Sequence, residues 1–148
     1  MSNALELLYD NLLKKEEQAR AIYLATLSEE KKFEQQLNAL NNYRSIYSSE
    51  LNAKGFNSPL SNAIYSQYTG FINRLDNISK EQLEGLKKIR IERENKLQAY
   101  KEIEAKRKGL EHLMNKRRQE QIDKMNKQEQ KLSDDLSTIK AFNREGLD

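Results

Sequence analysis

Apolar residues recur at spacings of three and four along almost the whole chain, which is the pattern of helices with one apolar stripe. In the first third of the chain, nine of thirteen candidate stripe positions are apolar or aromatic, and a second run of the same kind begins at Ile64. Two long helices are therefore predicted. The candidate stripe of the first helix comprises Leu5, Leu8, Leu12, Lys15, Ala19, Ile22, Thr26, Glu29, Phe33, Gln36, Leu40, Tyr43 and Tyr47.

One short interruption separates the two runs, and it contains the only proline, Pro59. Gly55 is expected to take the left-handed conformation that ends a helix without a Cβ clash, with Phe56 packing back on Leu51. Ser58 and Pro59 then suit the start of the next helix. We expect a first helix over about 3–54, a turn over about 55–59 and a second helix over about 60–142.

A connection this short makes consecutive helices antiparallel. The predicted fold is therefore all-α: an antiparallel two-helix coiled-coil hairpin, a single domain over 1–148, with a longer second helix. Folding the chain about residue 57 or 58 joins positions whose numbers add to about 115, and this register leaves the middle of the seam weaker than its ends. It pairs Tyr47 with Tyr68, Phe33 with Gln82, Thr26 with Ile89, Ile22 with Arg93 and Leu12 with Ile103.

The second helix carries two features of its own. Its stripe repeats every eleven residues at Leu75, Leu86 and Leu97, which predicts a nearly straight seam. It is also much longer than the first, so residues 111–142 are expected to overhang. Because isolated helices depend on packing for stability, the apolar stripe from Ile122 to Ile139 is interpreted as a surface that binds a partner.

Composition agrees with a thin coiled coil, since 36% of the 148 residues are hydrophobic and 33% are charged. The absence of cysteine excludes disulfides and thiolate metal sites. No apolar run approaches the roughly 18 residues of a membrane span, and the N-terminus lacks the features of a signal peptide. We expect a cytoplasmic protein.

Positive charge is concentrated in one stretch of the second helix. Residues 87–118 hold twelve basic and five acidic residues, a net charge of +7, although the whole chain has only +3. A solvated helix face is the simplest interpretation. An acidic protein partner, nucleic acid or an anionic membrane surface are the alternatives.

The sequence contains no arrangement typical of catalysis. His112 is the only histidine and has no partner that would complete a metal site. The five glycines are scattered, so no phosphate-binding loop is present. We expect neither enzymatic activity nor a metal or cofactor.

Aromatic residues are concentrated beside the predicted turn. A two-helix rod buries only one stripe of each helix, so some of these rings are expected to be exposed to a partner. The six residues are Tyr43, Tyr47, Phe56, Tyr65, Tyr68 and Phe71.

Two motifs flank the turn: L-x-x-Y-x-x-x-Y-x-x-x-L over 40–51, and Y-x-x-F-I-x-x-L over 68–75. This part of the chain resembles the flagellar export protein FliJ family. The resemblance implies an antiparallel coiled coil that serves, without catalysis, as a stalk and adaptor in flagellar type III export. The implied partners are the export ATPase ring, the cytoplasmic domain of the export gate and export chaperones, at the inner face of the cell membrane. The related stalk of a virulence injectisome, and a basic coiled coil that binds nucleic acid or a membrane surface, are the alternatives.

The resemblance and the unequal helix lengths each imply a partner-binding site. Several gate-site residues also belong to the predicted seam, so their rings are expected to have one edge in the seam and the other on the surface. Motif matching implies a gate-binding patch of Gln36, Leu40, Tyr43, Tyr47, Phe71, Leu75, Ile78 and Gln82. The paired termini and the overhang are expected to bind the ATPase ring through Leu5, Leu8, Arg117, Arg118, Ile122, Met125 and Leu132.

Overall fold

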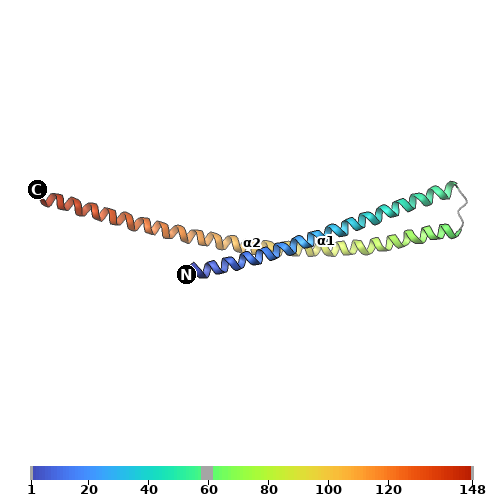
Figure 1. The fold of residues 1–148 in the computed structure, drawn as a ribbon, viewed down its shortest axis with the longest axis horizontal. Helices are drawn as coiled ribbons and strands as arrows, with labels where there is room; N and C mark the ends of the chain where they lie inside the picture. Colours follow the sequence, from blue (N-terminus) through green and yellow to red (C-terminus); the bar gives the residue numbers. More distant parts are fainter. Residues whose placement is uncertain (1, 58–61, 148) are drawn as a thin grey trace. The chain divides into compact units, whose positions relative to one another are not determined.

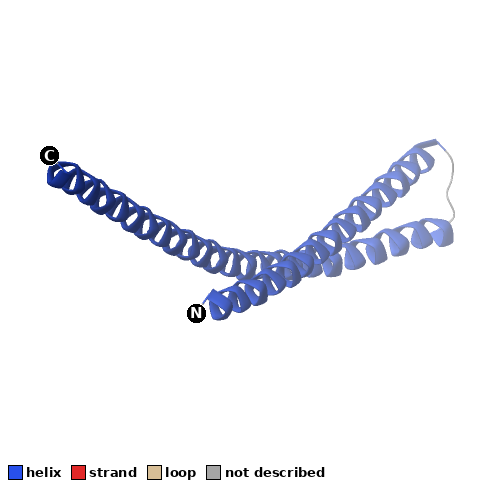
Figure 2. Cartoon of the chain, turned by 60° about the vertical axis from the view of Figure 1, so that its left-hand side comes forward, coloured by secondary structure: helices blue, strands red, loops and turns tan. Residues whose placement is uncertain are grey.

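The computed structural model describes residues 2–57 and 62–147, with side chains over 3–54 and 62–146. Helix α1 spans Ser2–Asn57 and helix α2 spans Asn62–Leu147 (Figure 1). The described part of the chain contains these two helices and no strand (Figure 2). The prediction of an all-α protein with two long helices, the second longer, is therefore confirmed.

Helix α1 continues through Gly55, where the sequence predicted its end. None of the described glycines has a positive φ, so the expected left-handed cap is not present. The predicted roles of Ser58 and Pro59 lie outside the described residues. Helix α2 extends to Leu147, beyond the expected end near 142.

The chain divides into two compact units. The central unit comprises residues 15–103, and the terminal unit comprises residues 1–14 together with 104–148. No helix among the described residues combines the length and apolar character that crossing a membrane requires.

In the central unit, residues earlier in α1 contact residues later in α2. Arg44 pairs with Asp76, and farther back along α1 Glu30 pairs with Arg93. The predicted ring contact between Tyr47 and Tyr68 is present, with centroids 6.2 Å apart. The register toward the middle differs from the prediction by about three or more residues. Phe33 lies against Gly85, three residues past the predicted Gln82, and Arg93 pairs with Glu30, eight residues past the predicted Ile22.

The buried stripe of α1 in the central unit uses different positions from those predicted. Tyr23, Glu30 and Leu37 are buried or half-buried, where Ile22, Glu29 and Gln36 were expected. The positions shared by both patterns, every seventh residue from Ala19 to Leu40, are buried or half-buried as predicted. These positions together are Ala19, Tyr23, Thr26, Glu30, Phe33, Leu37 and Leu40.

On α2 the same displacement occurs, with Ile72 and Ser79 in the stripe instead of Phe71 and Ile78. The predicted series Leu75, Leu86 and Leu97 is covered. The positions that alternate in steps of four and three, a heptad repeat that favours left-handed supercoiling, are covered as well. They are Tyr68, Ile72, Leu75, Ser79, Gln82, Leu86, Ile89 and Arg93.

The middle of the seam, expected to be its weakest part, contains most of the buried side chains of the described residues. Leu86 and Ile89 are 3% and 6% exposed on α2, and Thr26 and Glu30 are buried on α1. The Thr26 hydroxyl donates a 2.9 Å hydrogen bond to the carbonyl oxygen of Ile22, which satisfies a polar group inside an apolar layer. The middle of the seam is thus its most covered part, although two of its buried residues are polar.

The terminal unit is covered over a short length only. Leu5, Tyr9 and Leu12 of α1 are half-buried, as are Leu110 and Met114 of α2. Every residue from 115 to 146 is exposed. The predicted pair of Leu12 with Ile103 joins the two units and stays a prediction.

Candidate partner-binding surfaces

Three rings of the central unit form an aromatic cluster: Tyr47 of α1 with Tyr68 and Phe71 of α2. The Tyr47 and Phe71 centroids are 4.6 Å apart with an interplanar angle of 65°, an edge-to-face contact. Such pairs contribute about 0.5–1.5 kcal/mol beyond the area that they bury. The cluster therefore ties α1 to α2 through ring geometry as well as through apolar contact.

Lys54 extends this cluster on the α1 side. Its ammonium donates a 2.9 Å hydrogen bond to the Tyr68 hydroxyl and lies 5.3 Å from the centre of the same ring. The hydrogen bond with Tyr68 raises the pKa of Lys54 above its ordinary value of 10.5, because it favours the charged ammonium. The spacing of residues gives no signal for Lys54, since a lysine near a helix end is usually a solvated residue.

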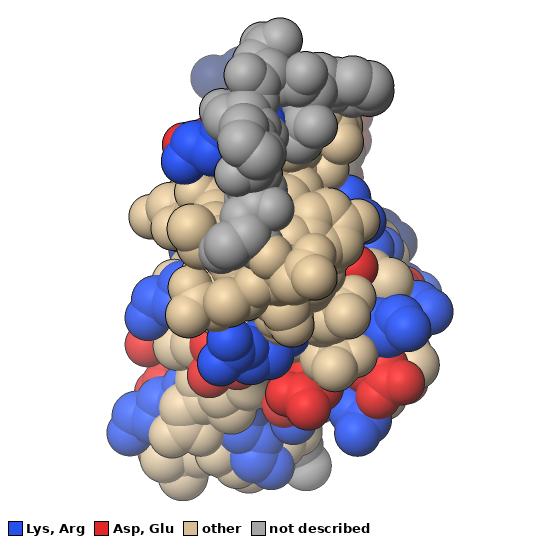
Figure 3. Space-filling model, turned by 90° about the vertical axis from the view of Figure 1, so that its right-hand side faces the viewer, with Lys and Arg blue, Asp and Glu red and all other residues tan. Residues whose placement is uncertain are grey.

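The aromatic cluster is open to solvent on one side. Tyr47, Gln67, Tyr68 and Phe71 line a shallow groove. The view onto this end of the central unit shows uncharged surface with charged side chains around it (Figure 3). Other large apolar side chains on the two helices here are also exposed, namely Tyr43, Ile46, Ile64 and Tyr65. A surface of this kind is typical of a protein-binding site.

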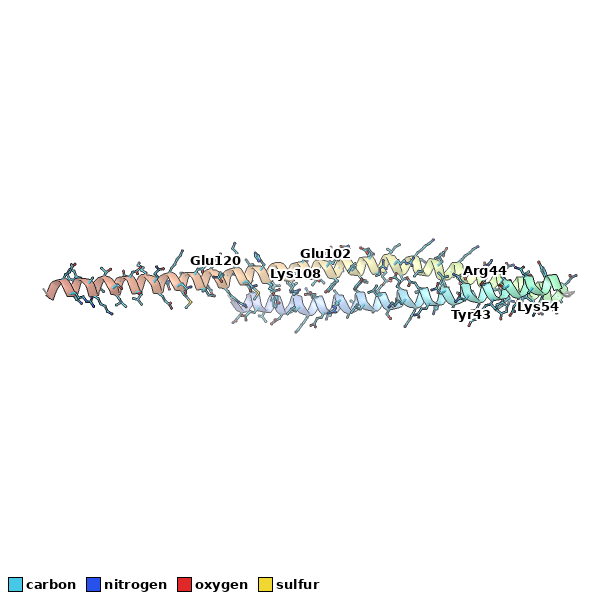
Figure 4. All side chains as sticks on the ribbon, turned by 90° about the horizontal axis from the view of Figure 1, so that it is seen from above. Tyr43, Arg44, Lys54, Glu102, Lys108 and Glu120 are labelled. Atoms are coloured by element: carbon cyan, nitrogen blue, oxygen red, sulfur yellow. The ribbon has the colours of Figure 1, made fainter. Side chains whose placement is uncertain are left out.

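The predicted gate patch divides into exposed and covered residues. Tyr43 is 56% exposed, and it points away from the side of α1 on which Arg44 reaches Asp76 (Figure 4). Leu75 is only 6% exposed, so it packs within the seam and is not accessible to a partner. Of the others, Gln36, Phe71 and Ile78 are exposed, and Leu40, Tyr47 and Gln82 are half-buried.

Two buried polar atoms lie within the same stretch of α2. Neither Ser79 Oγ nor Gln82 Oε1 has a hydrogen-bond partner. Leaving such a group unsatisfied costs about 1–3 kcal/mol, so the section between Leu75 and Leu86 is weaker than the layers on either side. Both positions belong to the covered heptad stripe, where the sequence places polar residues instead of apolar ones.

An ionic network crosses the middle of the central unit. Both carboxylate oxygens of Glu30 accept hydrogen bonds from Arg93 Nη1, at 2.7 and 2.9 Å, and Arg90 Nε lies 3.4 Å from Glu30. Arg90 also donates to Glu34 at 3.3 Å. The buried Glu30 is therefore paired, as a charge inside a helical seam must be. Part of the basic stretch at 87–118 is accounted for by this internal pairing.

The residues predicted to bind the ATPase ring all lie in the terminal unit. Leu5 is half-buried, whereas Leu8 and the residues at and beyond Arg117 are exposed. A groove beside Leu5 and Met114 is bordered by Arg117, Arg118 and Lys124. Farther along α2, Ile122, Met125 and Leu132 are 50%, 61% and 62% exposed.

Within the described residues, no group of three or more His, Cys, Asp or Glu side chains is arranged to hold a metal ion. His112 is exposed on α2. The accessible features of both units are instead apolar and aromatic surfaces on long helices. They define a helical scaffold whose candidate sites are contact surfaces.

The comparisons with known proteins identify the family. The family model described as "Flagellar FliJ protein" matches residues 1–146, so the chain belongs to the FliJ family. The chain is thus a protein of flagellar biogenesis and protein export. No curated protein and no solved structure matches the chain.

Proposed function

We propose that the chain is a non-enzymatic stalk and adaptor of the flagellar export apparatus, built as an antiparallel coiled-coil hairpin. It binds the export ATPase ring through the terminal unit and the cytoplasmic domain of the export gate through the aromatic cluster and its exposed neighbours. Export chaperones are its further partners. These contacts hold it in the cytoplasm against the inner face of the cell membrane.

The observation that carries this proposal is the presence of two exposed apolar surfaces, one in each unit. The aromatic cluster with Tyr43 belongs to the central unit, and the stripe from Ile122 to Ile139 belongs to the terminal unit. Two surfaces on one chain suit an adaptor that binds two partners. The opposite order of the contacts in the central unit, together with the heptad spacing of its covered residues, supports the antiparallel coiled coil.

Binding to the ring would act by multivalency. A stalk that contacts several ATPase subunits at once raises their effective concentration for one another and so promotes ring assembly. The test is the hydrolysis rate of the export ATPase with the full chain and with a variant lacking residues 119–148. We expect the truncated chain to lose stimulation and to keep gate binding. Loss of gate binding without loss of stimulation would refute the assignment of ring binding to the terminal unit and gate binding to the central unit.

The gate site is tested with two variants, one that removes an exposed side chain and one that removes a buried side chain. Tyr43→Ala removes an exposed ring and should weaken gate binding in a pull-down at unchanged melting temperature. Leu75→Ala removes a buried side chain and should cost about 2–4 kcal/mol of stability. If Tyr43→Ala binds the gate like the unmodified chain, the exposed half of the predicted patch is not the gate site.

A further inference from the structure

The exposed part of α2 carries an apolar stripe that α1 does not cover. Its members are at least half exposed, although they are the residue types usually found in cores. The stripe begins past Met114, the last half-buried residue of α2. The residues are Ile122, Met125, Leu132, Leu136, Ile139 and Phe142.

The spacing of this stripe has a symmetry that suits antiparallel pairing. Ile122, Glu129 and Leu136 form one row with a seven-residue repeat, and Met125, Leu132 and Ile139 form a second row of the same length. Reversing the helix about a point between Gln130 and Lys131 exchanges the two rows. Ile122 then falls on the place of Ile139, and Met125 on the place of Leu136. The stripe is thus complementary to itself when one copy runs in the opposite direction.

We propose that this stripe docks a second copy of the chain, so that the free protein is a dimer joined by an antiparallel coiled coil of residues 115–146. The interface is isologous, with each copy contributing the same surface. Its layers pair Ile122 with Ile139 of the second copy, Met125 with Leu136 of the second copy, and Glu129 with Leu132 of the second copy. Each pair occurs twice, so four of the six layers are wholly apolar.

Electrostatics favours the antiparallel arrangement over a parallel one. In a parallel pair in register, Glu129 would face Glu129 of the second copy inside the seam, a like-charge contact that destabilises a coiled coil. The basic stretches at 87–118, each with net charge +7, would also lie side by side. In the antiparallel pair Arg118 lies opposite Asn143, so the two Arg118 residues are ~38 Å apart, well beyond the Debye length of about 8 Å.

This dimer uses the stripe that the proposed function assigns to the export ATPase ring. The two states therefore exclude one another, and the dimer masks the overhang until the ring displaces the second copy. Formation of the dimer is tested independently of the proposed function, because the measurement uses the chain without any export component.

The first test is the mass of the full chain by sedimentation equilibrium over a range of concentrations. We expect the mass to rise from 17.4 kDa toward twice that value. Leu132→Asp should raise the dissociation constant at least about tenfold, since it places a charge against Glu129 of the second copy. The control Gln130→Asp adds the same charge on the outer side of the helix and should change the dissociation constant less than about twofold. A mass of 17.4 kDa at every concentration overturns the proposal.

The second test fixes the direction of the helices, and it uses the absence of cysteine from the chain. Met125→Cys and Leu136→Cys are made separately and oxidised alone or as a mixture. The antiparallel pair brings residue 125 of one copy within disulfide reach of residue 136 of the other, so the disulfide should form only in the mixture. Dimers in either variant alone would show a parallel pair and overturn the proposal.

Discussion

The ring of Phe33 on α1 lies so close to the backbone of Gly85 on α2 that a Cβ atom at Gly85 would be only 2.8 Å from Phe33 Cε1. Glycine at this position admits the ring, even though glycine costs about 1 kcal/mol in the interior of a helix. The contact sets the stagger of the two helices, because sliding one along the other places a larger side chain under the ring.

Gly85→Ala should therefore destabilise the protein, by about 1 kcal/mol, since the clash with Phe33 outweighs the gain in helix propensity. Gly70→Ala is the matched control, because a Cβ there meets nothing within 4 Å. It should stabilise the protein by about 0.5–1 kcal/mol. Urea unfolding followed by circular dichroism measures both. Equal stabilisation by the two variants would show that Phe33 adjusts without cost.

Loss of the buried carboxylate of Glu30 should destabilise the protein more than loss of the exposed carboxylate of Glu34. Glu30→Gln removes the charge that Arg93 binds through both oxygens, and we expect a loss of about 1–2 kcal/mol, allowing for the partial exposure of Arg93. Glu34→Gln should cost less than about 0.5 kcal/mol, because Glu34 and Arg90 are both largely exposed. Unfolding free energies of the two variants that fall in the reverse order would contradict this account.

The two unsatisfied polar atoms predict a stabilising substitution. Ser79→Ala removes a buried hydroxyl without a partner and should raise the free energy of unfolding by about 1 kcal/mol. Part of any such gain reflects the higher helix propensity of alanine. The exposed Ser45→Ala reports that part alone, and its effect is subtracted. If the two variants gain equally, burial of the Ser79 hydroxyl costs nothing.

The hydrogen bond from Lys54 to Tyr68 predicts a pH effect. The bond raises the pKa of Lys54 above 10.5, so its contribution to stability is fully present below pH 10.5 and is lost as the pH rises through the raised pKa. Tyr68→Phe should lower the pKa of Lys54 toward 10.5. Nuclear magnetic resonance titration of the Lys54 side chain measures this shift. The same pKa in both proteins would rule out the hydrogen bond as its cause.

The two-helix architecture follows from the sequence because apolar periodicity and the lone proline act over short distances. The register between the helices does not follow from the sequence, because two adjacent positions can each be apolar enough to enter the seam. Ile22 and Tyr23 are both apolar enough for it, and only the covered one, Tyr23, belongs to the heptad that the structure adopts. The choice depends on contacts between distant residues, such as Phe33 with Gly85 and Glu30 with Arg93.

The candidate site was predictable to a similar extent. The concentration of aromatic residues pointed to a surface near the turn, and the rings of Tyr47, Tyr68 and Phe71 do meet there. Leu75 entered the predicted patch through motif matching, although it also belongs to the seam and is buried. The part played by Lys54 requires the hydroxyl of Tyr68 in three dimensions and has no signal in the spacing of residues.

The uninterrupted exposure of residues 115–146 has a practical consequence. Because none of these side chains is shielded by α1, a fluorophore or an affinity handle attached there leaves the layers of the central unit intact. The outward positions, away from the stripe of Ile122 and Leu136, offer places for labels that report when this segment becomes occupied. The architecture thus separates the part of the chain that must hold its shape from the part that can carry a reporter.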